Sequence, residues 1–258
     1  MYKPEEVVDI CIQIGVNKVK KPLREKCILG FIAGAMISLG YLVDIRVSAS
    51  VAESWGSFAS FIGACVFPIG LIVILLGGGE LITGNIMTVS IAWLDKKVIL
   101  RDMMMNWIII TIMNFIGAIF VAYCFGHLAG LTTSGDYLHL TTKMSHAKIS
   151  STALESFISG VGCNWFVCLA VWLCAAIKDG AGKIMGIWFP IMTFVAIGFQ
   201  HSVANMFVIP AAIFEGNGTW GEFVENFIPV YFGNILGGMV MVAMFYYYAY
   251  KHHSDVKY

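Results

Sequence analysis

The chain has 258 residues, of which 59% are hydrophobic and 12% are charged, and its mean hydropathy is +0.80. Soluble domains carry roughly 25% charged residues, so this composition indicates a membrane protein. The 16 basic and 16 acidic residues cancel, and their balance argues against a nucleic-acid partner, which requires a clustered basic surface.

Residues 1–26 predict a cytoplasmic segment built around an amphipathic helix. Pro4 and two glutamates open this helix and lysines close it, which matches the polarity of the helix dipole. A basic cluster between Lys18 and Lys26 precedes the first apolar run. The positive-inside rule therefore places this segment in the cytoplasm, with the helix on the inner membrane surface.

Six apolar stretches follow, and they predict six membrane crossings. They lie at about 27–43, 57–93, 103–126, 150–177, 184–214 and 227–250. Basic connections at 95–101 and 178–183 and an acidic one at 215–225 place both termini inside. We therefore expect one multi-pass domain over 27–250 in the inner or plasma membrane, and a cytoplasmic tail over 251–258.

The second and fifth apolar stretches are too long for one straight helix, since a crossing needs about 20 residues. The second contains GGGELITGN at 77–85, and the fifth contains GFQHSVAN at 198–205. Glycines and polar side chains at mid-membrane predict a break in each helix, because unwound backbone is tolerated where it lines a cavity.

An internal repeat relates the two halves of the membrane domain, at about 27–126 and 150–250. FIAGA at 31–35 matches FISGV at 157–161, and FPI occurs at 67–69 and at 189–191. NFIGAIFVA at 114–122 resembles NILGGMVMV at 234–242. Three crossings in each half make the repeats inverted, so we predict an all-α, aquaporin-like fold with its substrate site at the midplane. The alternative is a duplication that serves only packing.

His201 is the only histidine inside an apolar stretch, and an ionisable residue at this depth is a functional candidate. The alternative is a neutral histidine held between helices. Thr83 lies near the position related to His201 by the repeat, so its hydroxyl is a candidate partner of the ring or the substrate. Asn164 fits either a substrate contact or a bond between helices.

The first break holds candidate structural residues. Glu80 pairs with Gln200 in the repeat, and Asn85 pairs with Asn205. Beside Gly79, the Glu80 carboxylate is expected to accept backbone N–H groups that the break leaves free.

Other candidates flank the breaks or the entrance of the fourth crossing. Lys148 lies at the outer entrance of that crossing, either as an anion-attracting group or as a snorkelling lysine. Leu71, Leu81, Ile82 and Phe194 flank the breaks, either as apolar constrictions or as ordinary packing.

The motifs GGGELITGNIM, KISSTALESFISGVGCNWFVCLAVW and GFQHSVANMF resemble the formate/nitrite transporter family over nearly the whole chain. Among its branches the chain is most similar to the hydrosulfide channel. The resemblance implies a homopentamer with one pore in each protomer. It implies pore residues His201, Thr83, Asn164 and Lys148, with constrictions at Leu71 and Phe194 on the inside and Leu81 on the outside.

These features predict a channel, not an enzyme, for small anions of weak acids, with hydrosulfide favoured and formate and nitrite also compatible. His201 is expected to pass a proton to the anion, because an apolar constriction excludes charge. We expect no cofactor and no metal, since the scattered cysteines show no ligand spacing.

Two other functions compete with this prediction. A neutral-solute channel of the aquaporin type would carry Asn-Pro-Ala at both breaks, whereas this chain has Asn-Ile-Met at 85–87 and Asn-Met-Phe at 205–207. A haem-binding redox subunit would need two intramembrane histidines, and the sequence supplies one.

Overall fold

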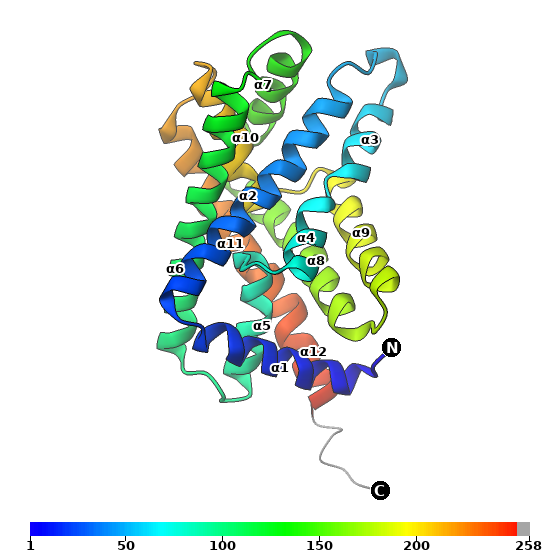
Figure 1. The fold of residues 1–258 in the computed structure, drawn as a ribbon, viewed down its shortest axis with the longest axis vertical. Coiled ribbons are helices and arrows are strands. Elements are labelled where there is room, and N and C mark those ends of the chain that lie inside the picture. Colours follow the sequence, from blue (N-terminus) through cyan, green and yellow to red (C-terminus); the bar gives the residue numbers. More distant parts are fainter. Residues whose placement is uncertain (252–258) are drawn as a thin grey trace, which may run out of the picture.

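The computed structural model describes residues 1–251, and this part of the chain is built of helices without strands (Figure 1). The helices are α1 (Pro4–Lys20), α2 (Leu23–Ser48), η1 (Glu53–Trp55), α3 (Phe58–Val66), α4 (Ile69–Gly77), α5 (Ile82–Leu94), α6 (Leu100–Phe120), η2 (Val121–Leu128), α7 (Gly135–Ile149), α8 (Ala153–Ala176), α9 (Gly180–Ile197), α10 (Ser202–Phe214), α11 (Trp220–Gly238), η3 (Met239–Met244) and α12 (Phe245–Tyr250). Of the expected tail, only Lys251 lies within the described residues.

Six helical segments of the described chain are long and apolar enough to cross a membrane, which confirms the predicted number. They are α2, the run α3–α4, the run α6–η2, α8, α9 and the run α11–η3–α12. The half-helices α5 and α10 have 13 residues each and are too short to cross alone.

Both predicted helix breaks are confirmed. The second crossing ends at Gly77 and resumes at Ile82, and the fifth ends at Ile197 and resumes at Ser202. The residues directly after the first half of each, Gly78 and Gly198, have φ angles of 104° and 88°. Such angles are readily adopted by glycine, which lacks Cβ, so the sequence itself ends each helix there.

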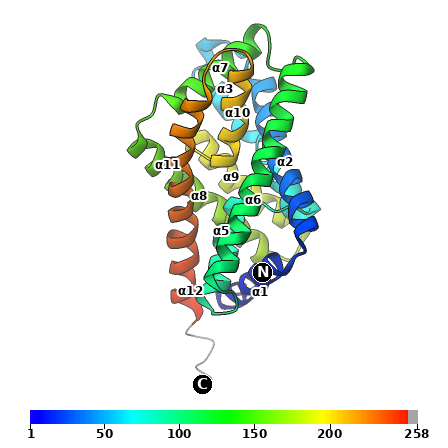
Figure 2. The ribbon, with the colours of Figure 1, turned by 90° about the vertical axis from the view of Figure 1, so that its left-hand side faces the viewer.

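The two halves run in opposite directions through the molecule. In Figure 1, α5 descends from the centre toward the end that carries the N-terminus, whereas α10 rises toward the opposite end. Figure 2 shows the same arrangement after a quarter turn. The half-helices α5 and α10 therefore begin near the centre and point away from each other, as expected for inverted repeats.

Each half also carries a peripheral helix, and the one in the second half is absent from our sequence prediction. We treated residues 127–149 as a connection, but they contain α7, which packs on α10 as α1 packs on α5. The polar sequence GDYLHLTTKMSHAKI lacks the apolar run by which we identified the crossings. The repeat is therefore larger than the predicted 27–126 and 150–250.

Close helix packing through glycines brings each break within reach of a neighbouring helix. On α6, Gly117 packs directly on the Phe31 carbonyl of α2, and on α11, Gly233 packs on the Phe157 carbonyl of α8. A Cβ atom at either glycine would overlap that carbonyl. Such small residues let membrane helices approach closely, so a short side chain can bridge two backbones there.

Candidate functional site

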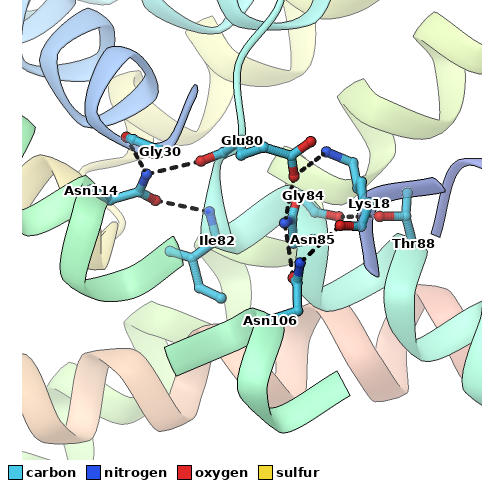
Figure 3. Close-up of polar contacts among 9 residues, drawn as sticks. All are labelled: Lys18, Gly30, Glu80, Ile82, Gly84, Asn85, Thr88, Asn106 and Asn114. Atoms are coloured by element: carbon cyan, nitrogen blue, oxygen red, sulfur yellow. Dashed lines mark hydrogen bonds and ion pairs between the residues drawn. The ribbon is translucent and has the colours of Figure 1, made fainter. Parts of the chain in front are cut away.

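Asn114 of α6 binds the free backbone groups at the first break (Figure 3). Its Oδ1 accepts a hydrogen bond from the backbone N–H of Ile82 at 2.9 Å. Its Nδ2 donates to the carbonyl oxygens of Gly30 at 2.8 Å and of Glu80 at 2.9 Å. One buried amide therefore satisfies the N–H of Ile82 and the carbonyl of Glu80, which the break leaves without helical partners, and also bonds the carbonyl of Gly30 in α2.

Asn234 of α11 does the same at the second break. Its Oδ1 accepts from the backbone N–H of Ser202 at 2.9 Å, and its Nδ2 donates to the carbonyls of Gly160 at 2.8 Å and of Gln200 at 3.2 Å. Asn114 and Asn234 open the matching segments NFIGAIFVA and NILGGMVMV. The repeat thus preserves the hydrogen bonds that hold each break.

The side chain of Glu80 has a different role from the expected one. Its Oε2 accepts from Lys18 Nζ at 3.0 Å and from Asn85 Nδ2 at 2.8 Å, and Asn85 also donates to Asn106 Oδ1 at 3.0 Å (Figure 3). The expectation that this carboxylate binds freed backbone N–H groups is wrong, because Asn114 takes the N–H of Ile82. Glu80 instead ties α1 to the break through an ion pair.

The second repeat forms a matching network with one charge fewer. Asn205 Nδ2 donates to Gln200 Oε1 at 2.9 Å and to Asn226 Oδ1 at 2.8 Å, and Asn226 Nδ2 donates to the carbonyl of Lys148 at 2.9 Å. Lys148 thus occupies on α7 the place that Lys18 occupies on α1. Since Gln200 is uncharged where Glu80 is charged, Lys148 forms no ion pair like that of Lys18 within residues 1–251.

His201 caps the N-terminus of α10 and is 2% exposed. Its Nδ1 accepts from the backbone N–H of Ala204 at 3.1 Å, and its Nε2 lies 2.9 Å from Thr83 Oγ1. Because a backbone amide can only donate, Nδ1 carries no proton, and a neutral ring therefore carries its proton on Nε2. In that tautomer Nε2–H donates to Thr83, which brings the two breaks together at the centre of the molecule.

Asn164 of α8 is fully buried and bonds to backbone groups. Its Nδ2 donates to the carbonyl of Asn234 at 2.6 Å and to that of Thr83 at 3.3 Å. It therefore links α8 and α11 to the start of α5. The sequence left two roles open for Asn164, a substrate contact or a bond between helices. In the structure its amide bonds neighbouring helices, and it contacts Thr83 through the backbone carbonyl of that residue.

Two cavities approach His201 from opposite ends of the molecule. The Lys148 cavity has a volume of about 570 Å³, and its lining includes Lys148, Asp44, Phe67, Phe194 and His201. The Lys18 cavity has a volume of about 640 Å³, and its lining includes Lys18, Leu75, Gly79, Glu80 and Lys183. Both reach inward from the ends, but His201 lines only the first of the two.

A narrow apolar space of about 10 Å³ adjoins the Lys148 cavity, and its lining residue Leu81 is next in sequence to Glu80 of the Lys18 cavity. It is lined by Ile37, Phe67, Leu71, Leu81, Val167, Ile191, Phe194 and His201. Phe67 and Phe194 also line the Lys148 cavity, and their rings meet edge to face with centroids 5.9 Å apart. Aromatic rings therefore border this space on the Lys148 side.

This geometry corrects two expectations about the constrictions. Phe194 faces the Lys148 cavity, on the side opposite the N-terminus, while Leu81 directly follows Glu80, which lines the Lys18 cavity. If the N-terminus lies inside, as the sequence predicts, the sides expected for these two residues are exchanged, because the second half-helix pair enters from the opposite end. Among the described residues, Ile82 lines none of the three spaces and is fully buried as the first residue of α5.

Comparison with known proteins agrees with this architecture. The family model described as "Formate/nitrite transporter" matches residues 5–248. The chain belongs to the formate/nitrite transporter family.

Members of this family with high similarity include an uncharacterized transporter, YrhG, of Bacillus subtilis, which is 54% identical over 98% of this chain and 95% of its own length. The formate channel BtFdhC of Bacillus thuringiensis is 51% identical and covers 99% of both chains. A solved structure, the "Pentameric formate channel with formate bound", superposes with a TM-score of 0.78 at 28% identity, covering 90% of this chain and 98% of that one. These relatives do not support the hydrosulfide branch over others.

Proposed function

We propose that this protein is a channel for small anions of weak acids, with formate as its first candidate substrate. The observation that carries the proposal is the pair of cavities at opposite ends of the molecule, with a short apolar space lined by His201 next to the Lys148 cavity. The names of a relative 51% identical to this chain and of a similar solved structure both refer to formate. Hydrosulfide, which the sequence favoured, and nitrite are the other members of the class to compare.

The arrangement suits an anion that is attracted by the partial positive charge of helix N-termini and is then neutralised by protonation. The N-termini of α5 and α10 begin at the two breaks, and helix N-termini favour negative charge. A bare anion cannot enter an apolar constriction cheaply, because moving an ion into a low-dielectric medium costs tens of kcal/mol in the idealised case. Protonation before the constriction removes this cost.

His201 is our candidate for the group that exchanges a proton with the anion, and its geometry adds a condition. A doubly protonated ring would carry a proton on Nδ1, and this proton would face the backbone N–H of Ala204. Protonation therefore ends the N-cap bond of α10, a loss of about 0.5–2 kcal/mol. Each time His201 takes up and releases a proton, the hydrogen bond between its Nδ1 and the N–H of Ala204 must therefore break and form again.

The assembly and orientation belong to the same proposal. We propose a homopentamer with one pore in each protomer, because the similar solved structure is a pentameric formate channel. We propose that both termini lie in the cytoplasm of the cell, because basic residues gather at the end that carries α1. The Lys148 cavity then opens to the outside.

The experiment that tests the function is flux into proteoliposomes, compared for formate, nitrite and hydrosulfide at two pH values. The proposal predicts uptake of weak-acid anions above that of protein-free vesicles, with faster uptake at the lower pH. Permeability to water and glycerol without anion flux would instead favour a neutral-solute channel. The ranking of the three anions assigns the substrate.

Replacing Lys148 by Ala is expected to weaken anion entry through the Lys148 cavity while leaving assembly intact. The backbone carbonyl of Lys148, and not its side chain, holds Asn226, so the network at the second break survives. The loss should shrink at high salt, because screening weakens the attraction. Wild-type uptake by this variant at low ionic strength would contradict the role of Lys148.

A further inference from the structure

Asp44 of α2 is a buried carboxylate in the wall of the Lys148 cavity, and the proposed transport mechanism gives it no role. Its exposed fraction is 3%, and its Oδ1 accepts from Ser48 Oγ at 3.2 Å. On the facing helix α3, Gly63 leaves the space that the carboxylate fills, since a Cβ there would overlap Oδ1. Asp44 therefore has a place built for it between α2 and α3.

The charges around this cavity do not favour anions. Besides Asp44 on α2, the lining includes the carboxylate of Glu155 on α8, and its cation is Lys148 on α7. Asp44 and Lys148 lie close enough to interact electrostatically. With Asp44 ionised, its charge offsets that of Lys148, and the exposed Glu155 adds a smaller, solvent-screened negative charge, so the mouth does not attract anions.

The other titratable groups near Asp44 do not reverse this balance. Tyr41 on α2 also lines the cavity, and Cys163 on α8 interacts with Lys148. A phenol and a thiol add no positive charge. His201, at the start of α10, accepts the N–H of Ala204 on Nδ1 and is neutral in that geometry. The sign of the charge in the cavity therefore depends on Asp44.

The Lys18 cavity at the other end has the opposite charge. Four lysines line it, namely Lys18, Lys21, Lys178 and Lys183, against the single carboxylate of Glu80. That carboxylate is already bound by Lys18 Nζ at 3.0 Å. An anion is therefore attracted into one mouth and, while Asp44 is ionised, is opposed at the other.

We propose that Asp44 is a counter-charge that limits anion entry through the Lys148 cavity, so that neutralising its carboxylate opens this mouth to anions. The inference rests on the proposed anion channel and adds to it a residue that controls one entrance. Protonation of Asp44 has the same electrostatic effect as its replacement by Asn. External acid therefore favours entry of anions, and entry from the Lys18 side is much less affected.

The test compares initial formate uptake into intact cells, where all copies share one orientation, for wild type, Asp44→Asn and Asp44→Ser. At low salt and neutral pH, both variants should take up formate on the order of three to ten times faster than wild type. The gain should fall at high salt and should vanish in acid, where wild type approaches the variants. Efflux should change much less.

Two further variants separate this role from a general effect on the channel. In the background of Lys148→Ala, replacing Asp44 should leave uptake below that of Asp44→Asn alone, because the cavity then lacks the attracting lysine charge. Glu155→Gln removes an equal charge from an exposed position of the same cavity, so solvent screening should leave a smaller effect. Equal uptake by Asp44→Asn and wild type at low salt, or a gain from Glu155→Gln as large as that from Asp44→Asn, would overturn the proposal.

A second measurement remains informative if wild type does not carry formate, a result that would count against the proposed function. Labelling of Lys148 by a membrane-impermeant anionic amine reagent, followed by mass spectrometry, reports the charge of the cavity directly. The inference predicts faster labelling in Asp44→Asn than in wild type, with Glu155→Gln close to wild type. Unchanged labelling would contradict it, whatever the transported solute.

Discussion

The variant Asn114→Leu is expected to lose most of its folded, assembled protein. Leucine has the same number of side-chain heavy atoms but makes no hydrogen bond, so the N–H of Ile82 and the carbonyl of Glu80 lose their partner, while the carbonyl of Gly30 keeps its bond within α2. An unsatisfied buried polar group costs about 1–3 kcal/mol, so two of them should lower the stability by roughly 2 kcal/mol or more.

The measurement is the midpoint of thermal loss of the assembled peak in size-exclusion chromatography in detergent. Asn17→Leu is the matched control, because this exposed residue of α1 accepts only a surface hydrogen bond from Gln13. We expect the control to stay close to wild type. An Asn114→Leu protein as stable as the control would show that water or lipid satisfies the break, against our account of how the fold holds it.

His201→Asn is expected to keep its assembly but to lose the pH dependence of its transport. The oxygen of Asn is a good N-cap acceptor and can replace Nδ1 as the partner of the Ala204 N–H, so α10 should begin as before. The new side chain cannot titrate near neutral pH. If His201 exchanges protons with the anion, the flux at mildly acid pH should fall toward that at mildly alkaline pH.

The control for this variant is His201→Ala, which removes the cap as well as the ring. It should lower stability by about 0.5–2 kcal/mol, whereas His201→Asn should not. The two variants therefore separate the structural role of the ring from its proton exchange. An assembled His201→Asn channel with an unaltered pH profile would end the relay mechanism. The ring would then act as a neutral donor through Nε2–H.

Much of the fold could be predicted because the membrane imposes strong rules on a sequence. The glycines at 77–79 and at 198 marked the two breaks, since long apolar stretches cannot remain straight helices across one bilayer. Helix α7 was not predicted, because its polar sequence contains no apolar run of the kind that marks a membrane crossing. Helix α7 is recognised only as the counterpart of α1 in the repeat. The structure shows this correspondence, because Asn106 donates to the carbonyl of Lys18 on α1 and Asn226 donates to the carbonyl of Lys148 on α7.

Site residues could be predicted from the sequence where their residue type is rare inside the membrane. They could not be predicted where their role depends on contacts that only the folded structure forms. His201 and Thr83 were candidates by position, and the structure brings them within 2.9 Å. Asn114 and Asn234 were missed as functional residues, although both open the repeated segment. Asp44 was missed because a carboxylate near the end of an apolar run resembles an ordinary helix end. The facing glycine and the shared cavity are properties of the fold alone.

The central claim, that small anions cross each protomer past the apolar space next to His201, is tested most directly by changing the size of that space. Leu71 lines it and is 1% exposed. Initial rates of radiolabelled formate uptake should be compared in proteoliposomes of wild type, Leu71→Trp and Leu71→Ala, each with assembly verified. The account predicts that Trp reduces formate flux to near that of protein-free vesicles, and that Ala admits larger or hydrated solutes. Formate flux that is unchanged by Trp in an assembled protein would contradict the route and, with it, the account.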